Sequence, residues 1–168
     1  MSNYRPISIL TSFTKTFEKV MQTRLLKHLT DHNILCKEQY GFVTKRKTVN
    51  ATYQLTNEIL NALNNNLLIG GIFCDFEKAF DCVNHKILLS KLEFCGITGN
   101  HYKFYKSYLT NRYQRTLLYN ENGNIITSTW AKIEHGVSQG LVLGPLLFLI
   151  LVFINDLPKF VNDKSVLF

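Results

Sequence analysis

The sequence is poor in proline and in acidic residues, and it lacks a long apolar run. It has 3 prolines and 12 acids against 19 Lys and Arg. The longest unbroken apolar stretch, Leu146 to Ile154, is far shorter than the roughly 20 residues that cross a bilayer. We interpret this stretch as a buried core helix and expect no membrane partner. There is no internal repeat, linker or low-complexity tract.

The cysteines and the N-terminus show no sign of secretion. The four cysteines form no CxxC pair and no Cys/His spacing typical of zinc; they are Cys36, Cys74, Cys82 and Cys95. No secretory leader starts the sequence. We therefore expect a reducing, intracellular location, nuclear or cytoplasmic. The oligomeric state is left open.

The composition predicts a packed core and an uneven charge. With 168 residues, 46% apolar and 12% aromatic, the chain suits one domain or a piece of a larger one. Nine basic and three acidic residues fall in residues 1–50, which therefore hold six of the seven net positive charges. Such a basic third favours a polyanion as partner, and a solubilising surface is the alternative explanation.

Apolar spacing predicts four helices before residue 110. Phe17, Val20, Met21, Leu25 and Leu29 recur at three-and-four spacing in Thr14 to Asn33, which Thr11 or Ser12 could cap. Ala51, Leu55, Ile59 and Leu63 form a second stripe that the run Asn64-Asn65-Asn66 ends. Two further stripes predict a helix that stops near Gly96 and another over His101 to Leu109.

The remaining segments predict strands and a final helix. An apolar strand is expected at 67–75, and β-prone stretches at Arg115 to Tyr119 and Ile125 to Glu134 are joined through Asn122-Gly123, a hairpin signal. A glycine-rich bend at Gly136 to Gly140 precedes an apolar helix with Pro145 at its first position. This order of elements predicts an α+β fold.

A carboxylate at the end of the expected strand is the clearest candidate for chemistry. Asp75 follows the apolar run 67–72, and Asp81 comes six residues later, beyond a turn. Carboxylates at sheet edges are common metal ligands, but an acidic pair by a strand end can also be a solvated turn or helix cap. The bend Ser138-Gln139-Gly140 strengthens the functional interpretation because its backbone could approach a ligand closely.

Several motifs in one order resemble a known family. In chain order they are Asn3-Tyr4-Arg5-Pro6-Ile7-Ser8, Glu38-Gln39-Tyr40-Gly41-Phe42, Asp75 to His85, Gly136-Val137-Ser138-Gln139-Gly140, Gly144-Pro145-Leu146-Leu147-Phe148 and Ile154-Asn155-Asp156-Leu157-Pro158. This order resembles the reverse transcriptase domain of non-LTR retrotransposons, the jockey-like and related elements, over essentially the whole chain. The resemblance implies the fingers (about 1–66) and part of the palm (about 67–168, with inserted helices and a hairpin) of a right-hand polymerase, in one domain fragment.

The resemblance also implies roles for particular residues. Asp75 would bind both catalytic Mg²⁺ ions, with help from the backbone carbonyl of Phe76. Phe80 would lie under the sugar of the incoming nucleotide and exclude a 2′-hydroxyl, or it is a core side chain. Gln139 and Gly140 would contact the nucleotide. A final set of basic residues would contact triphosphate and template, or be solvated surface; it comprises Arg5, Lys45, Arg46 and Lys47.

The implied partners are an RNA template, a DNA primer and a deoxynucleoside triphosphate. The resemblance gives Asp81 no metal, so we expect it to cap a helix or support a ligand. The histidines, His85 among them, are interpreted as structural.

The sequence departs from the family pattern in ways that bear on activity. The motif that supplies two further aspartates would begin where the sequence ends, at Phe168, and one carboxylate cannot hold two Mg²⁺ ions. Val43, Ser138 and Leu141 replace the usual residues, and the last helix looks two residues longer than the family's. We therefore expect a fragment of an RNA-directed DNA polymerase that does not polymerise alone. Two alternatives are left open: an inactive nucleic-acid-binding remnant, or a translated relic without function.

Overall fold

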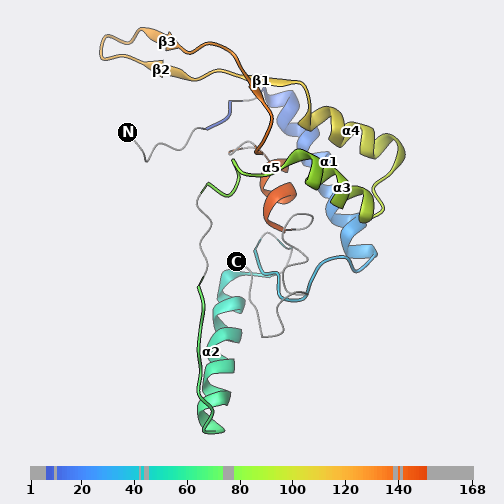
Figure 1. Cartoon of the computed structure of the whole chain (residues 1–168), viewed down its shortest axis with the longest axis vertical. Coiled ribbons are helices and arrows are strands. Elements are labelled where there is room, and N and C mark those ends of the chain that lie inside the picture. Colours follow the sequence, from blue (N-terminus) through green and yellow to red (C-terminus); the bar gives the residue numbers. More distant parts are fainter. Residues whose placement is uncertain are drawn as a thin grey trace.

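The structure combines helices with two small antiparallel sheets, as the sequence predicts for an α+β chain. It is a computed structural model that describes residues 7–9, 11–41, 43, 46–73, 78–137, 140 and 142–150. The helices and strands follow one another along the chain (Figure 1): α1 (Ser12–Asp31), α2 (Thr48–Asn64), α3 (His85–Phe94), α4 (Gly99–Leu109), β1 (Arg112–Gln114), β2 (Leu117–Tyr119), β3 (Ile125–Thr127), β4 (Ala131–Ile133), α5 (Leu143–Pro145) and the π-helix η1 (Leu146–Ile150).

Helix α1 begins at the predicted cap, but its buried face is narrower than its apolar stripe. The Thr11 side-chain oxygen accepts from the Thr14 backbone N–H at 3.3 Å, which satisfies one of the free donors of the first turn. Phe17 and Val20 were expected in the core with the rest of the stripe, and they are 47% and 45% exposed. The three residues of the stripe that are buried are Met21, Leu25 and Leu29.

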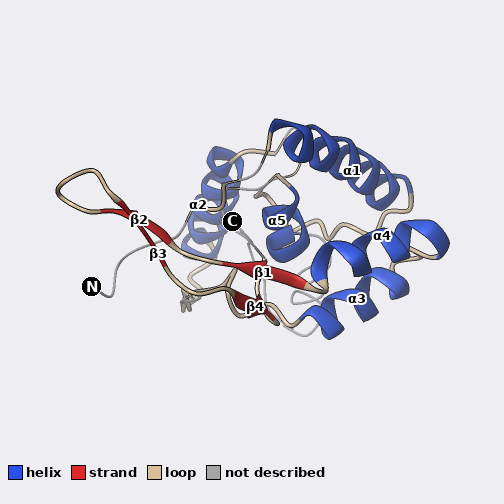
Figure 2. Cartoon of the chain, turned by 90° about the horizontal axis from the view of Figure 1, so that it is seen from above, coloured by secondary structure: helices blue, strands red, loops and turns tan. Residues whose placement is uncertain are grey.

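One hydrophobic core joins α1, α3, α4 and the α5–η1 segment (Figure 2). Helix α3 starts where Asn84 accepts from the backbone of Lys86 and Ile87 at 2.9 and 3.2 Å. Gly96 follows its end with a φ of +83°, a conformation that glycine adopts without strain. The core residues come mainly from these four elements, and each buried leucine stabilises the fold by roughly 2 kcal/mol; the leucines are Leu25, Leu29, Leu88, Leu89, Leu92, Leu109, Leu143, Leu146 and Leu147.

Helix α2 lies apart from this core (Figure 1). Of its predicted stripe, only Ala51 is buried. The helix ends at the asparagine run as predicted, because Asn65 is its C-cap and Asn66 has a φ of +54°. No described helix is long and apolar enough to cross a membrane.

The strand predicted at 67–75 was wrong over its described part. Residues 67–73 have no regular secondary structure, and residues 74–77 lie outside the described residues. The side chains of Leu68 and Ile72 are 103% and 92% exposed. A strand needs a neighbour for its backbone hydrogen bonds, and no described strand pairs with this segment.

The predicted hairpin forms, with a second pairing at its base. β2 pairs antiparallel with β3, with Leu118 opposite Ile126, and Gly123 closes the turn with a φ of +75°. β1 pairs antiparallel with β4, with Tyr113 opposite Lys132. The sequence analysis missed β1 and placed the start of the first strand at Arg115, in the break between β1 and β2. The β2–β3 arm extends away from the helices (Figure 1), and all six of its strand residues are exposed.

The last helix starts two residues before Pro145 and then widens. α5 begins at Leu143, and residues Leu146–Ile150 are π-helical. A π-helical turn takes in extra residues without rotating everything that follows. The π-helical segment therefore lies in the stretch where the sequence predicts a helix two residues longer than the family's.

A buried carboxylate links α1 to α4 and to the start of α5. Glu18 is 1% exposed. It accepts hydrogen bonds from the Tyr108 hydroxyl (2.8 Å) and from the backbone N–H groups of Val142 (3.0 Å) and Leu143 (3.4 Å). Gln22 of the same helix donates to the Val142 carbonyl at 3.4 Å. The carboxylate thus acts as the N-terminal cap that α5 lacks in its own sequence.

The Tyr108 hydroxyl stays protonated in this contact. Burial raises its pKa well above the ordinary value, and the neighbouring Glu18 charge raises it further. The phenol is therefore a permanent donor to the carboxylate.

Replacing Glu18 should destabilise the fold strongly. Glu18→Ala leaves two backbone N–H groups and a hydroxyl without their acceptor, and we expect a loss of roughly 3 kcal/mol in the free energy of unfolding. Glu93→Ala, at an exposed glutamate of α3, is the control and should change it by less than about 0.5 kcal/mol. Urea unfolding followed by circular dichroism measures both, and equal losses would contradict the capping role.

Candidate nucleotide-binding site

Two segments far apart in the sequence are joined by backbone hydrogen bonds at the candidate site. The Val137 N–H donates to the Phe80 carbonyl and the Gly136 N–H to the Val83 carbonyl, each at 2.8 Å. Asn84 and His135 form an antiparallel bridge next to them. The turn that follows Asp75 is therefore held against the start of the glycine-rich bend.

Gly136 is the tightest point of this junction. It has a φ of +86°, and a Cβ built on it would lie 3.0 Å from the Asp81 Cα and carbonyl oxygen and 3.1 Å from the Phe80 carbonyl oxygen. No side chain fits at these distances from a backbone. The buried ring of His85 is 2.6 Å from the Gly136 carbonyl through Nε2, which donates because a carbonyl only accepts. His85, interpreted from sequence as structural without a visible partner, thus fastens the same junction.

Phe80 is part of the turn at residues 78–82, and its side chain packs against the last helix. Its ring centroid is 5.0 Å from that of Phe148 in η1, with 42° between the ring planes, and the side chain is half-buried. The ring thus packs on the core and keeps an exposed part. Its role toward a nucleotide sugar stays a prediction.

The glycine-rich bend also meets the N-terminal segment. Gly140 has a φ of +86°, and a Cβ there would be 3.3 Å from the Ile7 side chain and 3.8 Å from the Ser8 backbone nitrogen. Described parts of three sequence motifs therefore meet at the bend: residues 7–8 at Gly140, and residues 80–85 at residues 135–137. Arg5 and Gln139, the predicted nucleotide contacts in these motifs, lie outside the described residues.

The basic cluster is part of a different loop. One guanidinium nitrogen of Arg46 donates to three backbone carbonyls, those of Cys36 (3.2 Å), Lys37 (2.7 Å) and Gln39 (2.7 Å). Arg46 is half-buried, whereas Lys47 is exposed. Lys45 lies outside the described residues.

The same loop is attached to α2. The Tyr40 hydroxyl donates to the Gln54 side-chain oxygen, and the Arg46 guanidinium is 5.9 Å from the Tyr40 ring centroid. Gln39 is fully buried and donates to the Gly41 carbonyl at 3.2 Å. Arg46 thus organises the segment around the Glu38 to Phe42 motif as well as carrying charge.

The described residues do not make up a magnesium site. Asp75 and Phe76, the predicted ligands, lie outside them, and no group of three or more His, Cys, Asp or Glu side chains in the described part could hold a metal ion. Asp81 is exposed. The side chain that caps α3 is that of Asn84, so Asp81 does not cap this helix, and the alternative expectation that Asp81 supports a ligand stays a prediction.

The sequence analysis did not single out Glu18, which anchors the segment after the bend. A signal was present, since Glu18 lies three and seven residues before Met21 and Leu25 and so falls on the buried face of α1. An acid on a buried face needs hydrogen-bond donors.

Comparison with known proteins identifies the class. A family model described as reverse transcriptase (RNA-dependent DNA polymerase) matches residues 1–167. The chain therefore belongs to the reverse transcriptase family.

Particular relatives of the chain include polymerases from mobile elements of Drosophila melanogaster. The chain is 37% identical over 156 residues to the probable RNA-directed DNA polymerase from transposon BS, over 93% of its own length. It is 34% identical to the RNA-directed DNA polymerase from mobile element jockey and 30% identical to the probable enzyme from transposon X-element, each over 94% of its length. It spans 16% of the length of each of these relatives. The match is thus to a fragment-length part of RNA-directed DNA polymerases of non-LTR retrotransposons, as the motifs predicted.

Alanine at Gly136 should loosen the junction between the two segments. Gly136→Ala combines a strained φ with a backbone clash, and we expect it to reduce the free energy of unfolding by roughly 3 kcal/mol. Gly123→Ala is the matched control, because it has a similar φ but no atom within 4 Å, and it should cost about 1 kcal/mol. Thermal unfolding of both variants measures the difference, and equal effects would refute a role of the close contact.

Proposed function

We propose that this chain forms the fingers-like part (about 1–66) and part of the palm (about 67–168) of an RNA-directed DNA polymerase of a non-LTR retrotransposon. The observation that carries the proposal is that residues 7–8 and 80–85 both contact the described residues of the bend, 136–137 and 140, and that the three segments come from three family motifs. At Gly136 the backbone of Phe80 and Asp81 fills the place of a side chain, and at Gly140 a Cβ would lie 3.3 Å from Ile7, so the close packing would hold the residues around a nucleotide in a fixed arrangement.

The nucleotide would be held by residues at and beside this junction. Gln139 and Gly140 would contact its sugar or base, and Arg5 its triphosphate. The exposed part of the Phe80 ring would lie under the sugar, where its bulk excludes a 2′-hydroxyl. The packing of this ring on Phe148 supports the proposal, because a steric barrier has to be rigid.

Mg²⁺ is the cofactor we propose, with Asp75 and the Phe76 carbonyl among its ligands. In nucleotidyl transfer this ion activates the attacking hydroxyl and neutralises the leaving pyrophosphate. These two oxygen donors are too few for a pair of ions. Further carboxylates are needed for activity.

Lys45, Arg46 and Lys47 are proposed to contact nucleic acid. The partners are an RNA template and a DNA primer, with a deoxynucleoside triphosphate as substrate, inside the cell in the nucleus or cytoplasm. Exposure of Lys47 supports a phosphate contact, whereas Arg46 acts through the loop that it organises. A non-catalytic nucleic-acid-binding role would use the same lysines, and the family match does not favour it.

Removing Asp75 should abolish polymerisation. The chain is joined to a relative's downstream segment that carries two further aspartates, and primer extension on an RNA template is measured with Mg²⁺. Asp75→Ala should lower the rate at least about a thousandfold, because a metal ligand is lost. Asp81→Asn in the same turn is the control and should lower it by less than about tenfold. Activity that survives Asp75→Ala would sink the proposal.

Lys47 and Arg46 should differ in their effect on nucleic-acid binding. Lys47→Gln should reduce the slope of log affinity against log salt by about one and leave the unfolding temperature unchanged, because it removes one phosphate contact. Arg46→Gln should lower the unfolding temperature by several degrees, since three carbonyls lose their donor. Filter binding at several salt concentrations and thermal scans distinguish the two. A salt slope untouched by Lys47→Gln would exclude this contact.

A further inference from the structure

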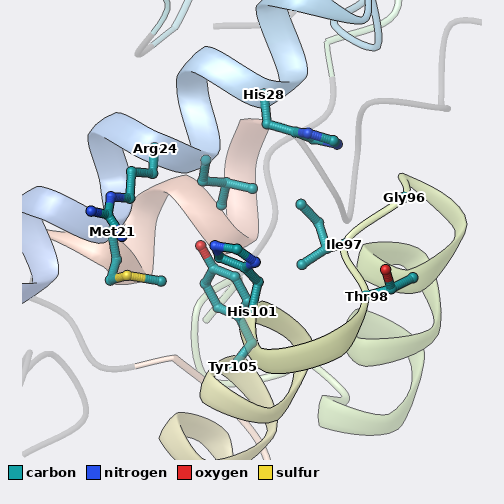
Figure 3. Close-up of a pocket in the computed structure, with 9 residues that line it drawn as sticks. Met21, Arg24, His28, Gly96, Ile97, Thr98, His101 and Tyr105 are labelled. Carbon is teal, nitrogen blue, oxygen red and sulfur yellow. The ribbon is translucent and has the colours of Figure 1, made fainter.

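A pocket of about 170 Å³ lies between α1 and the start of α4, away from the residues assigned above (Figure 3). Its apolar lining comes from Met21, Leu25 and Ile97, and the turn at Gly96 and Thr98 closes one side. Four polar or charged side chains complete the lining: Arg24, His28, His101 and Tyr105. None of the described residues that line it is acidic.

The Tyr105 hydroxyl lacks an acceptor in this pocket. The side chain is 2% exposed, and no described residue accepts a hydrogen bond from it. Its hydroxyl end points toward α1 and is drawn beside the His101 ring (Figure 3). Burial raises the pKa of Tyr105 well above the ordinary value, so the group remains an O–H donor. The hydroxyl oxygen is not among the described buried polar atoms without a partner, so it opens into the pocket, where it can donate to a ligand oxygen.

Three basic side chains from two helices line the same pocket as this hydroxyl: Arg24, His28 and His101. Arg24 and His28 are four residues apart on α1 and therefore share a face, and His101 lies in the first turn of α4. His28 is fixed by its contact with the Cys95 carbonyl at 2.8 Å through Nε2. No described residue forms a hydrogen bond or ion pair with the Arg24 guanidinium. The guanidinium is therefore available to a bound anion.

The N-terminus of α4 adds to the positive character of the pocket. Thr98 is its N-cap residue and makes no side-chain capping bond, and the first turn contains no acid. Backbone N–H groups at such a helix start carry a partial positive charge. The pocket thus brings together a guanidinium, imidazoles, a helix start and a hydroxyl without an acceptor among the described residues, and none of its described lining residues is acidic.

We infer that this pocket binds a phosphate group, with the Tyr105 hydroxyl and the Arg24 guanidinium as direct donors. Phosphate offers several strong acceptor oxygens at once, and its charge suits both Arg24 and the start of α4. The group could be free phosphate or a phosphate of a nucleic-acid strand. Binding here requires neither Asp75 nor polymerase activity, so the inference stands or fails independently of the proposed function.

Titration of the 168-residue chain with sodium phosphate tests the inference. Nuclear magnetic resonance follows the backbone amides of residues 99–101 at constant ionic strength, with sodium chloride as the reference. Arg24→Gln should weaken phosphate binding about tenfold, and Tyr105→Phe about threefold. Lys27→Gln is the matched control, since it removes an exposed charge from the same helix outside the pocket, and it should change the affinity by less than about twofold.

The outcomes separate the two phosphate sources and the folding effects. Tyr105→Phe keeps the buried ring and removes only the hydroxyl, so an unchanged unfolding temperature together with weaker binding supports a direct contact. Saturation by inorganic phosphate identifies a free anion site, and competition between phosphate and a short single-stranded DNA identifies a strand phosphate. Amide shifts that chloride reproduces would overturn the inference, as would a loss from Lys27→Gln equal to that from Arg24→Gln.

Discussion

The hydrogen bonds of the buried Glu18 carboxylate are the constraint on which the rest of the structure depends. One side chain of α1 accepts from α4 through Tyr108 and from the start of α5 through Val142 and Leu143. A buried charge is tolerated only when donors surround it, so the three elements have to meet in one arrangement. The hydrophobic core alone is less directional, because apolar contact does not fix orientation.

The candidate site inherits its geometry from this anchor. Glu18 fixes the backbone on one side of the glycine-rich bend, and the hydrogen bonds of Gly136 and Val137 to the turn at residues 80–83 fix the other side. The bend is therefore held at both ends, and at Gly136 it packs so closely on the backbone of Phe80 and Asp81 that no side chain fits between them. The phosphate pocket lies between the same two helices, α1 and α4, and is lined by residues within 21–28 and 96–105.

Local patterns gave most of the helices, because their signals are short-range. The spacing of Met21, Leu25 and Leu29, the Thr11 cap, the asparagine run after α2 and Gly96 after α3 all act within a few residues of the feature that they predict. The same holds for the Asn122-Gly123 turn. The strand at 67–73 failed because apolar residues signal burial, whereas a strand also needs a partner, and no described strand is paired with it.

By itself the sequence determined the family and the order of the motifs, because these depend only on which residues occur and in which order. The comparisons confirmed that assignment. Only the tertiary structure decided that Gly136 touches the backbone of Phe80 and Asp81, that Arg46 holds the loop at residues 36–39, and that Tyr105 and Arg24 line one pocket. The two bends at residues 80–85 and 135–137 lie some fifty residues apart along the chain. Contacts over such separations follow from how the whole chain packs, and no local pattern encodes them.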